Sequence, residues 1–86
     1  MGAKAVWVAG RVYQQLQNLV DVTPVGWAFG DGAQLRCYTD DPDRIRKPDA
    51  CFVRRGRFVP DEPPEGFITI PPDLVVEVVS PSDSYY

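Results

Sequence analysis

The chain has 86 residues, of which 44% are hydrophobic and 24% are charged, and its formal net charge is −3. A chain of this length forms one small domain at most and buries only about 60% of the surface that its unfolded form exposes. The acidic balance gives the chain as a whole no sign of nucleic-acid affinity and counts mildly against a DNA-binding module, although local basic patches matter more than the total.

The residue types also exclude several kinds of site. The chain has no histidine, and Cys37 and Cys51 form no CxxC pair, so a common zinc site is excluded. We expect two free thiols, because the N-terminal "AKAVWVAG" is too short for a secretory signal and lacks a cleavage site. No apolar run approaches the roughly 20 residues that span a bilayer. The sequence therefore predicts a cytoplasmic protein with no membrane partner.

The first expected element is an amphipathic helix that starts at Gly10 and stops at Thr23-Pro24. Its apolar residues recur with the spacing i, i+4, i+7, i+8, which is typical of one helix face packed on a core. These residues are Val12, Leu16, Leu19 and Val20.

A hairpin is expected next. "GWAFG" (26–30) predicts a short strand, "DG" (31–32) indicates a tight turn, and "AQLRCYT" (33–39) alternates well enough to be the antiparallel partner. After a loop at 40–43, a third strand is expected over roughly 45–53. Strand alternation would direct Asp49, Cys51 and Val53 to one face of it.

Residues 58–72 hold five of the nine prolines and predict an irregular connection over the surface. The following "LVVEVV" (74–79) is apolar on both faces, which is typical of a central strand covered on both sides. Ser82 or Asp83 would then cap a helix that begins near Ser84.

The order predicts an α/β (α+β) fold, with an N-terminal helix and a mixed sheet of about four strands. A two-sided central strand needs a covering layer on each face, and only one full helix is expected. We therefore expect residues 1–86 to be a single partial domain, a fragment or truncated form of a domain about twice as long.

Two carboxylates interrupt the apolar strands, Asp49 and Glu77. If the two strands pair, both side chains project from one face and repel each other, which a divalent cation relieves. Oxygen ligands favour Mg²⁺ or Mn²⁺, with the remaining positions taken by water and a substrate phosphate. Such an ion can activate a water and stabilise charge on a phosphodiester.

The same residues allow a plainer interpretation. Asp49 would form an ion pair with Arg46, Lys47 or Arg54, and Glu77 would face water at a sheet edge. The pattern of the sequence alone leaves both interpretations open.

Two blocks carry a resemblance to a known family. "RIRKPDACFVRRG" and "PPDLVVEVVSPSD", separated by the proline-rich segment, resemble the Uma-two family of bacterial proteins. That family is assigned to the PD-(D/E)XK restriction-endonuclease-like superfamily. The N-terminal "GRVYQQLQNLV" and "GWAFG" fit the helix and first strand of the same family, so the resemblance covers nearly the whole chain.

The resemblance implies a metal-dependent DNA endonuclease. Asp49 would bridge the metal and the scissile phosphate, Glu77 would be the second metal-binding carboxylate, and the backbone carbonyl of Val78 a further ligand. Asp73 would be structural, at the start of the strand. Phosphate contacts would come from basic residues around the Asp49 strand, of which we name Arg46, Lys47, Arg54 and Arg55; they would otherwise only keep an edge soluble.

The chain departs from the family pattern at three places. Val79 stands where the superfamily has a lysine, two positions after the second carboxylate, and in this family the lysine comes instead from a helix further downstream. Ala9 stands where the family often has a histidine, and Gln14 and Gln15 where a helical glutamate sometimes joins the site. We expect the 86-residue chain to cleave DNA poorly or not at all. The alternative is a non-catalytic, nuclease-derived module that oligomerises or binds a partner by extending its sheet.

Overall fold

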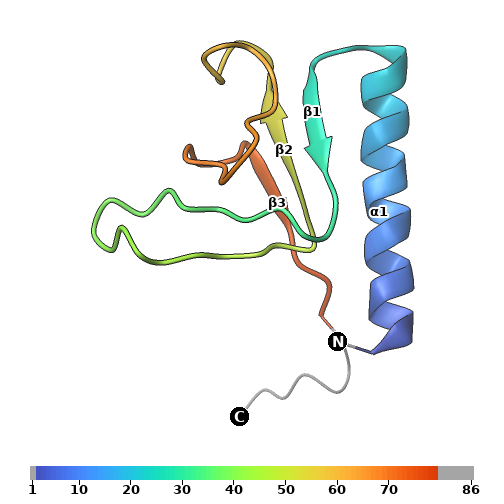
Figure 1. Cartoon of the computed structure of the whole chain (residues 1–86). Coiled ribbons are helices and arrows are strands. Elements are labelled where there is room, and N and C mark those ends of the chain that lie inside the picture. Colours follow the sequence, from blue (N-terminus) through green and yellow to red (C-terminus); the bar gives the residue numbers. More distant parts are fainter. Residues whose placement is uncertain (1, 80–86) are drawn as a thin grey trace.

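The computed structural model describes residues 2–79, which form one helix and three strands (Figure 1). The elements are α1 (Ala3–Val22), β1 (Gly26–Phe29), β2 (Ala50–Arg54) and β3 (Leu74–Val76). The predicted α+β class with an N-terminal helix is confirmed. The sheet has three antiparallel strands, one fewer than expected and not mixed. The helix predicted near Ser84, with its cap, lies outside the described residues.

Helix α1 begins seven residues earlier than the sequence analysis placed it. Gly10 lies inside the helix on an exposed turn. Glycine there lowers the stability of the helix by about 1 kcal/mol relative to alanine but does not end it. The residues that α1 buries are Ala5 and Ala9. The expected apolar face is therefore only partly correct, and Leu19 is 56% exposed. The helix ends as predicted, with Thr23 at its C-cap.

The partner of β1 is β2, and the hairpin predicted with residues 33–39 is wrong. Trp27 lies opposite Val53, and Phe29 lies opposite Cys51. The turn at 31–32 does form, with Gly32 at a φ of 109°. Residues 33–39 instead make only two isolated bridges, both at Leu35, and β2 takes the place beside β1 because it offers apolar side chains to both faces.

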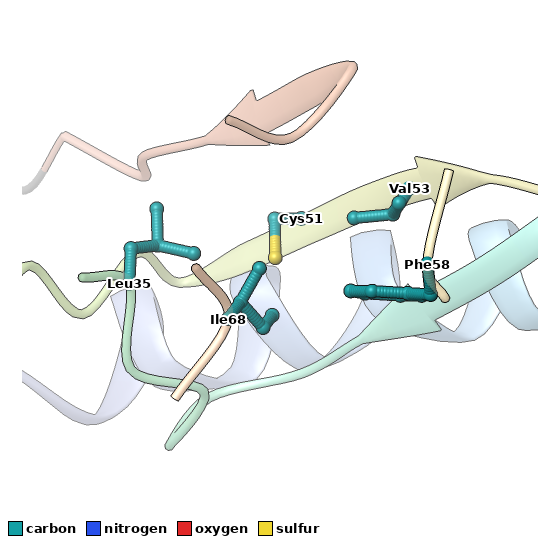
Figure 2. Packing of buried hydrophobic residues seen from close by; sticks show 5 residues of the cluster. All are labelled: Leu35, Cys51, Val53, Phe58 and Ile68. Carbon is teal, nitrogen blue, oxygen red and sulfur yellow. The ribbon is translucent and has the colours of Figure 1, made fainter. Parts of the chain in front are cut away.

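One face of the sheet carries the hydrophobic core (Figure 2). Cys51 and Val53 project from β2 and meet three residues from outside the strands, Leu35, Phe58 and Ile68. Leu35 bridges to Arg46 on one side and to Ile68 on the other. The proline-rich connection is thus not simply a surface loop, because its Phe58 and Ile68 close the core.

Small residues face the helix on the other side of the sheet. A side chain added at Gly30 would meet the ring of Tyr13, which places α1 over this face. Ala50 is fully buried here, and Ala5 and Ala9 of α1 are buried too. Alanine and glycine on both elements let α1 pack closely against β1 and β2.

Strand β3 lies at an edge of the described sheet, and β2 is the central strand. The expectation of a central, covered β3 is therefore wrong for residues 2–79. Leu74 and Val75 are each 45% exposed, because only β2 pairs with this strand in the described part of the chain. An apolar edge strand of this kind is open to further pairing.

Within residues 2–79, no helix is both long and apolar enough to cross a membrane. Cys37 and Cys51 are free thiols, as predicted.

Candidate functional site

Asp49 lies immediately before β2, at a bend, and its residue is only 8% exposed. It was expected to share a face with Cys51 and Val53, whereas it lines a cavity together with residues of α1. Strand β2 starts at Ala50, later than predicted, so the strand alternation does not extend to Asp49. The carboxylate is therefore held at the end of the strand, outside the core.

The backbone around Glu77 holds Asp49 in place. The N–H of Asp49 donates to the carbonyl oxygen of Val76 (3.1 Å), and the N–H of Val78 donates to Asp49 Oδ2 (2.6 Å). Asp49 thus bonds to the residues on both sides of Glu77. The two carboxylate-bearing segments do pair, as the two-carboxylate hypothesis requires, since Ala50 lies opposite Val76. Glu77 itself is exposed, just after the end of β3.

A cavity of about 150 Å³ opens beside Asp49. Its wall combines the N-terminal half of α1 with the chain that follows β1. The lining residues are Val6, Ala9, Gly10, Tyr13, Gly30, Asp31 and Asp49. The cavity therefore brings a second acidic residue, Asp31, to the same place as Asp49.

Asp31 is not marked as a site residue by the sequence pattern, because its "DG" dipeptide indicates a turn. Phe29 lies opposite Cys51, so continuing this register by two residues brings Asp31 to the level of Asp49. The position of Asp31 follows from the register of β1 on β2, so it can be derived only once β2 is known to be the partner strand.

The structure bears directly on the ion-pair interpretation of Asp49. Three ion pairs are found within residues 2–79, and none includes Asp49: they are Arg36–Asp43, Arg55–Asp61 and Arg57–Asp73. A carboxylate that is nearly buried and lacks a cation is costly unless something else neutralises it. The plainer interpretation of Glu77, a side chain in water at a sheet edge, agrees with its exposure.

Asp73 has the structural role that was expected of it. Its Oδ2 accepts the backbone N–H of Arg54 (2.8 Å) and Nη1 of Arg57 (3.0 Å), and its own N–H donates to the carbonyl of Phe52 (2.9 Å). The Arg54 N–H, followed by the Arg57 guanidinium, lowers the pKa of Asp73 below its ordinary value. These bonds join the start of β3 to the end of β2.

The basic residues fall into two groups at opposite ends of β2. Arg46 and Lys47 precede Asp49, whereas Arg54 and Arg55 follow Val53. Arg55 is engaged within the chain, by an ion pair with Asp61 (3.8 Å) and a position over the Trp27 ring (6.0 Å). The basic group beside the candidate site is therefore the pair Arg46 and Lys47, and both of these residues are exposed.

Cys51 is fully buried in the hydrophobic core, although it is two positions from Asp49. Burial raises its pKa to about 11, so the thiol stays protonated at neutral pH. Within residues 2–79 there is no group of three or more His, Cys, Asp or Glu side chains arranged to hold a metal ion. The possible metal ligands near Asp49 are thus carboxylate oxygens and backbone carbonyl oxygens.

The fold and the site define a small α+β protein in which Asp31 and Asp49 line one cavity at an end of the sheet. A family model matches the chain over residues 1–86, and the description of that family, Uma2, is "Putative restriction endonuclease". The chain belongs to this family. Searches of curated proteins and of solved structures gave no significant match.

Proposed function

We propose that the chain carries the metal-binding carboxylates of a DNA endonuclease, a hydrolase of phosphodiester bonds. The observation that supports this most directly is Asp49, which is nearly buried, accepts one backbone N–H and lacks an ion-pair partner within residues 2–79. The proposal takes its reaction class from the family, whose description names a restriction endonuclease.

The residues present fit a hard divalent cation such as Mg²⁺ or Mn²⁺. Mg²⁺ keeps several waters and needs only one or two protein carboxylates beside the substrate phosphate. Asp49 and Glu77 would supply these, with the carbonyl oxygen of Val78 as a further donor. When bound, the ion supplies activation of a water and stabilisation of charge on the phosphodiester. The hydrogen bond from the Val78 N–H to Asp49 Oδ2 would keep the carboxylate oriented when no ion is bound.

DNA is the substrate that the proposal requires, and Arg46 and Lys47 are the residues placed to contact its phosphates. Both residues are exposed and precede Asp49 by two or three positions. Positive charges beside an acidic site offset the repulsion between its carboxylates and the DNA backbone. Arg54 and Arg55, at the far end of β2, would contact phosphates more remote from the scissile bond.

Cleavage by residues 1–86 alone is expected to be slow or undetectable. Val79 stands two positions after Glu77 and supplies no charge to orient the attacking water. Loss of such an electrostatic contribution typically costs several kcal/mol of transition-state stabilisation, and each 1.36 kcal/mol is a factor of ten in rate.

Metal binding tests the proposal independently of cleavage. Titration of the chain with Mn²⁺, followed by calorimetry and by electron paramagnetic resonance, is expected to show one site. Asp49→Asn and Glu77→Gln are each expected to weaken it by about tenfold or more, or 1.4 kcal/mol. Asp43→Asn is the matched control, because its side chain is 91% exposed and remote from the site. Equal affinity in all four proteins would rule out the site.

Plasmid nicking tests the expected lack of activity. The 86-residue chain with Mg²⁺ or Mn²⁺ is expected to leave supercoiled plasmid intact. Metal-dependent nicking that disappears in Glu77→Ala would contradict this expectation while supporting the site.

A second candidate function is a non-catalytic module that binds by sheet extension. The exposure of Leu74 and Val75 on the edge strand β3 favours it. A partner strand added there would give backbone hydrogen-exchange protection to residues 74–76 on association. Association without such protection would exclude this candidate.

A further inference from the structure

The chain between β1 and β2 runs out from the sheet and back to it as a long arm, residues 33–47 (Figure 1). Two backbone hydrogen bonds between Leu35 and Arg46 (2.7 and 3.0 Å) close the base of this arm. The proline-rich connection is bound along it, because the N–H of Arg36 donates to the carbonyl oxygen of Ile68 (2.9 Å). The arm and the connection therefore form one short ladder outside the three-stranded sheet.

This ladder has an inner face and an outer face. Leu35 and Ile68 point into the hydrophobic core (Figure 2). Successive side chains of an extended chain point to opposite sides, so the residues next to these two turn outward. A groove of about 440 Å³ lies on the outer face, and its lining includes Arg36 and Tyr38 from the arm and Phe67 and Thr69 from the connection. This volume is ample for a nucleobase, since a cavity of about 150 Å³ already admits a benzene ring.

Two aromatic rings at this groove each lie against an arginine. The guanidinium carbon of Arg36 is 5.4 Å from the centre of the Phe67 ring, and that of Arg44 is 4.7 Å from the centre of the Tyr38 ring. The hydroxyl of Thr69 adds a hydrogen-bonding group to the lining. Proteins bind unpaired nucleotides with this combination, in which rings stack on bases and cations contact phosphates.

The side chain of Arg36 also fixes the tip of the arm. Its Nε donates to the carbonyl oxygen of Pro42 (2.7 Å), and its Nη2 donates to Asp43 Oδ1 (3.2 Å). The N–H of Arg44 donates to the carbonyl oxygen of Asp41 (3.0 Å) within the same turn. The groove is thus formed before a ligand arrives, which lowers the entropic cost of binding.

The local charge favours an anionic ligand, although the chain as a whole is acidic. Cations outnumber aspartates over residues 36–47, where Arg36, Arg44, Arg46 and Lys47 stand against Asp40, Asp41 and Asp43. The ion pair of Arg36 with Asp43 is exposed, with side-chain exposures of 41% and 91%. Such pairs contribute little to stability, so a phosphate can replace Asp43. The rings then favour a nucleotide over an acidic peptide, because every base has a face that stacks.

We propose that this groove binds an unpaired nucleotide of DNA, with the rings of Tyr38 and Phe67 as the stacking surface for the base and Arg36 as the phosphate contact. The choice of DNA rests on the proposed endonuclease function, and the groove narrows the substrate to DNA with a single-stranded segment. Through Arg46 and Lys47 the arm leads directly to Asp49, at the start of β2.

Fluorescence anisotropy of a labelled oligothymidine in EDTA tests the groove without any metal. We expect the 86-residue chain to bind it more tightly than a duplex of equal length at the same salt concentration. Tyr38→Ala and Phe67→Ala are each expected to weaken binding about tenfold, as loss of one stacking ring does. Tyr38→Phe keeps the ring and should bind as the parent chain does. Circular dichroism should show that all variants are folded.

Trp7→Ala is the matched control. Trp7 is an aromatic residue that is 65% exposed, lies 5.8 Å from the guanidinium of Arg11, and belongs to α1, away from the groove. Its replacement should leave the affinity for oligothymidine unchanged. An equal loss in Trp7→Ala and Phe67→Ala would overturn the proposal.

Asp43→Asn tests the phosphate contact. It removes the carboxylate that competes with a phosphate for Arg36, so binding should become severalfold tighter. A merely structural role of the ion pair predicts the reverse, and weaker binding would overturn the contact assigned to Arg36.

Three further results would overturn the proposal: tighter binding of the duplex than of oligothymidine, tighter binding of oligouridine, and binding of polyglutamate in place of both. Failure of the groove is distinguishable from failure of the proposed endonuclease site. The groove is tested in EDTA, whereas the Asp49 site is tested by Mn²⁺ titration without DNA.

Discussion

The two ends of β2 each hold an aspartate that follows a proline, and the two side chains are in opposite situations. Asp73, beside Arg54, has a backbone donor and an arginine, and it ties β3 to β2. Asp49, before Ala50, is more buried and has one backbone donor but no ion pair within residues 2–79. The same dipeptide thus forms an arginine-paired structural contact at one end and holds a carboxylate without an ion pair in residues 2–79 at the other. A nearly buried carboxylate without an ion-pair partner in residues 2–79 is the feature that marks the candidate site.

The largest expected effect is on stability, and it concerns how tightly the chain packs at the two ends of β2. A side chain added at Gly26, opposite Arg54, would collide with the carbonyl oxygen of Val53 and lie 2.6 Å from the Phe52 ring. Gly26→Ala is therefore expected to destabilise the fold by about 3 kcal/mol or more, measured by urea unfolding. Gly30→Ala is the control at the Asp49 end, where the new atom would meet the Tyr13 ring at 3.4 Å. A change there within about 1 kcal/mol is expected, and equal losses at both positions would contradict the difference in packing.

A smaller effect of opposite sign is expected at Asp49. In metal-free buffer, Asp49→Asn should stabilise the chain by about 1 kcal/mol, because it removes a nearly buried charge that has no ion-pair partner within residues 2–79 and keeps an acceptor for the Val78 N–H. Asp49→Ala removes that acceptor and should cost about 1–3 kcal/mol. Thermal unfolding of the three proteins without metal checks the order. A destabilised Asn variant would mean that the charge at position 49 is neutralised as completely as that at Asp73.

Asp73 should respond to pH in the manner of a structural carboxylate. Its pKa is lowered from 3.8, so its contribution to the free energy of unfolding is present above that value and is lost as the pH falls through the lower folded-state pKa. Asp73→Asn is expected to be less stable than the parent chain at pH 7, with the difference closing below about pH 4. Parallel melting curves across this range provide the measurement. A gap that stays constant down to pH 2 would show that the charge of Asp73 does not contribute.

The smallest effect concerns the two basic groups in DNA binding. If Arg46 and Lys47 contact phosphates, their joint replacement by alanine should lower the slope of log affinity against log salt by about 2. Arg55→Ala should change that slope by less, since Arg55 already pairs with Asp61. Fluorescence anisotropy of a labelled duplex at several salt concentrations measures both. A larger change for Arg55 would assign the DNA contact to the far end of β2.

The sequence by itself determined the local features of this protein. Thr23-Pro24 ends the helix and "GWAFG" forms a strand, because these features depend on residues within one element. Asp73 was likewise recognised as structural.

Only the tertiary structure decided which segments meet. It gave β1 the partner β2 instead of residues 33–39, brought Asp31 to the cavity beside Asp49, and used Phe58 and Ile68 of the proline-rich connection to close the core. It also showed that Leu19 lies outside the packed face of α1. The physical reason is that strand pairing and burial are competitions between segments far apart in the chain, and no local pattern records which of them wins.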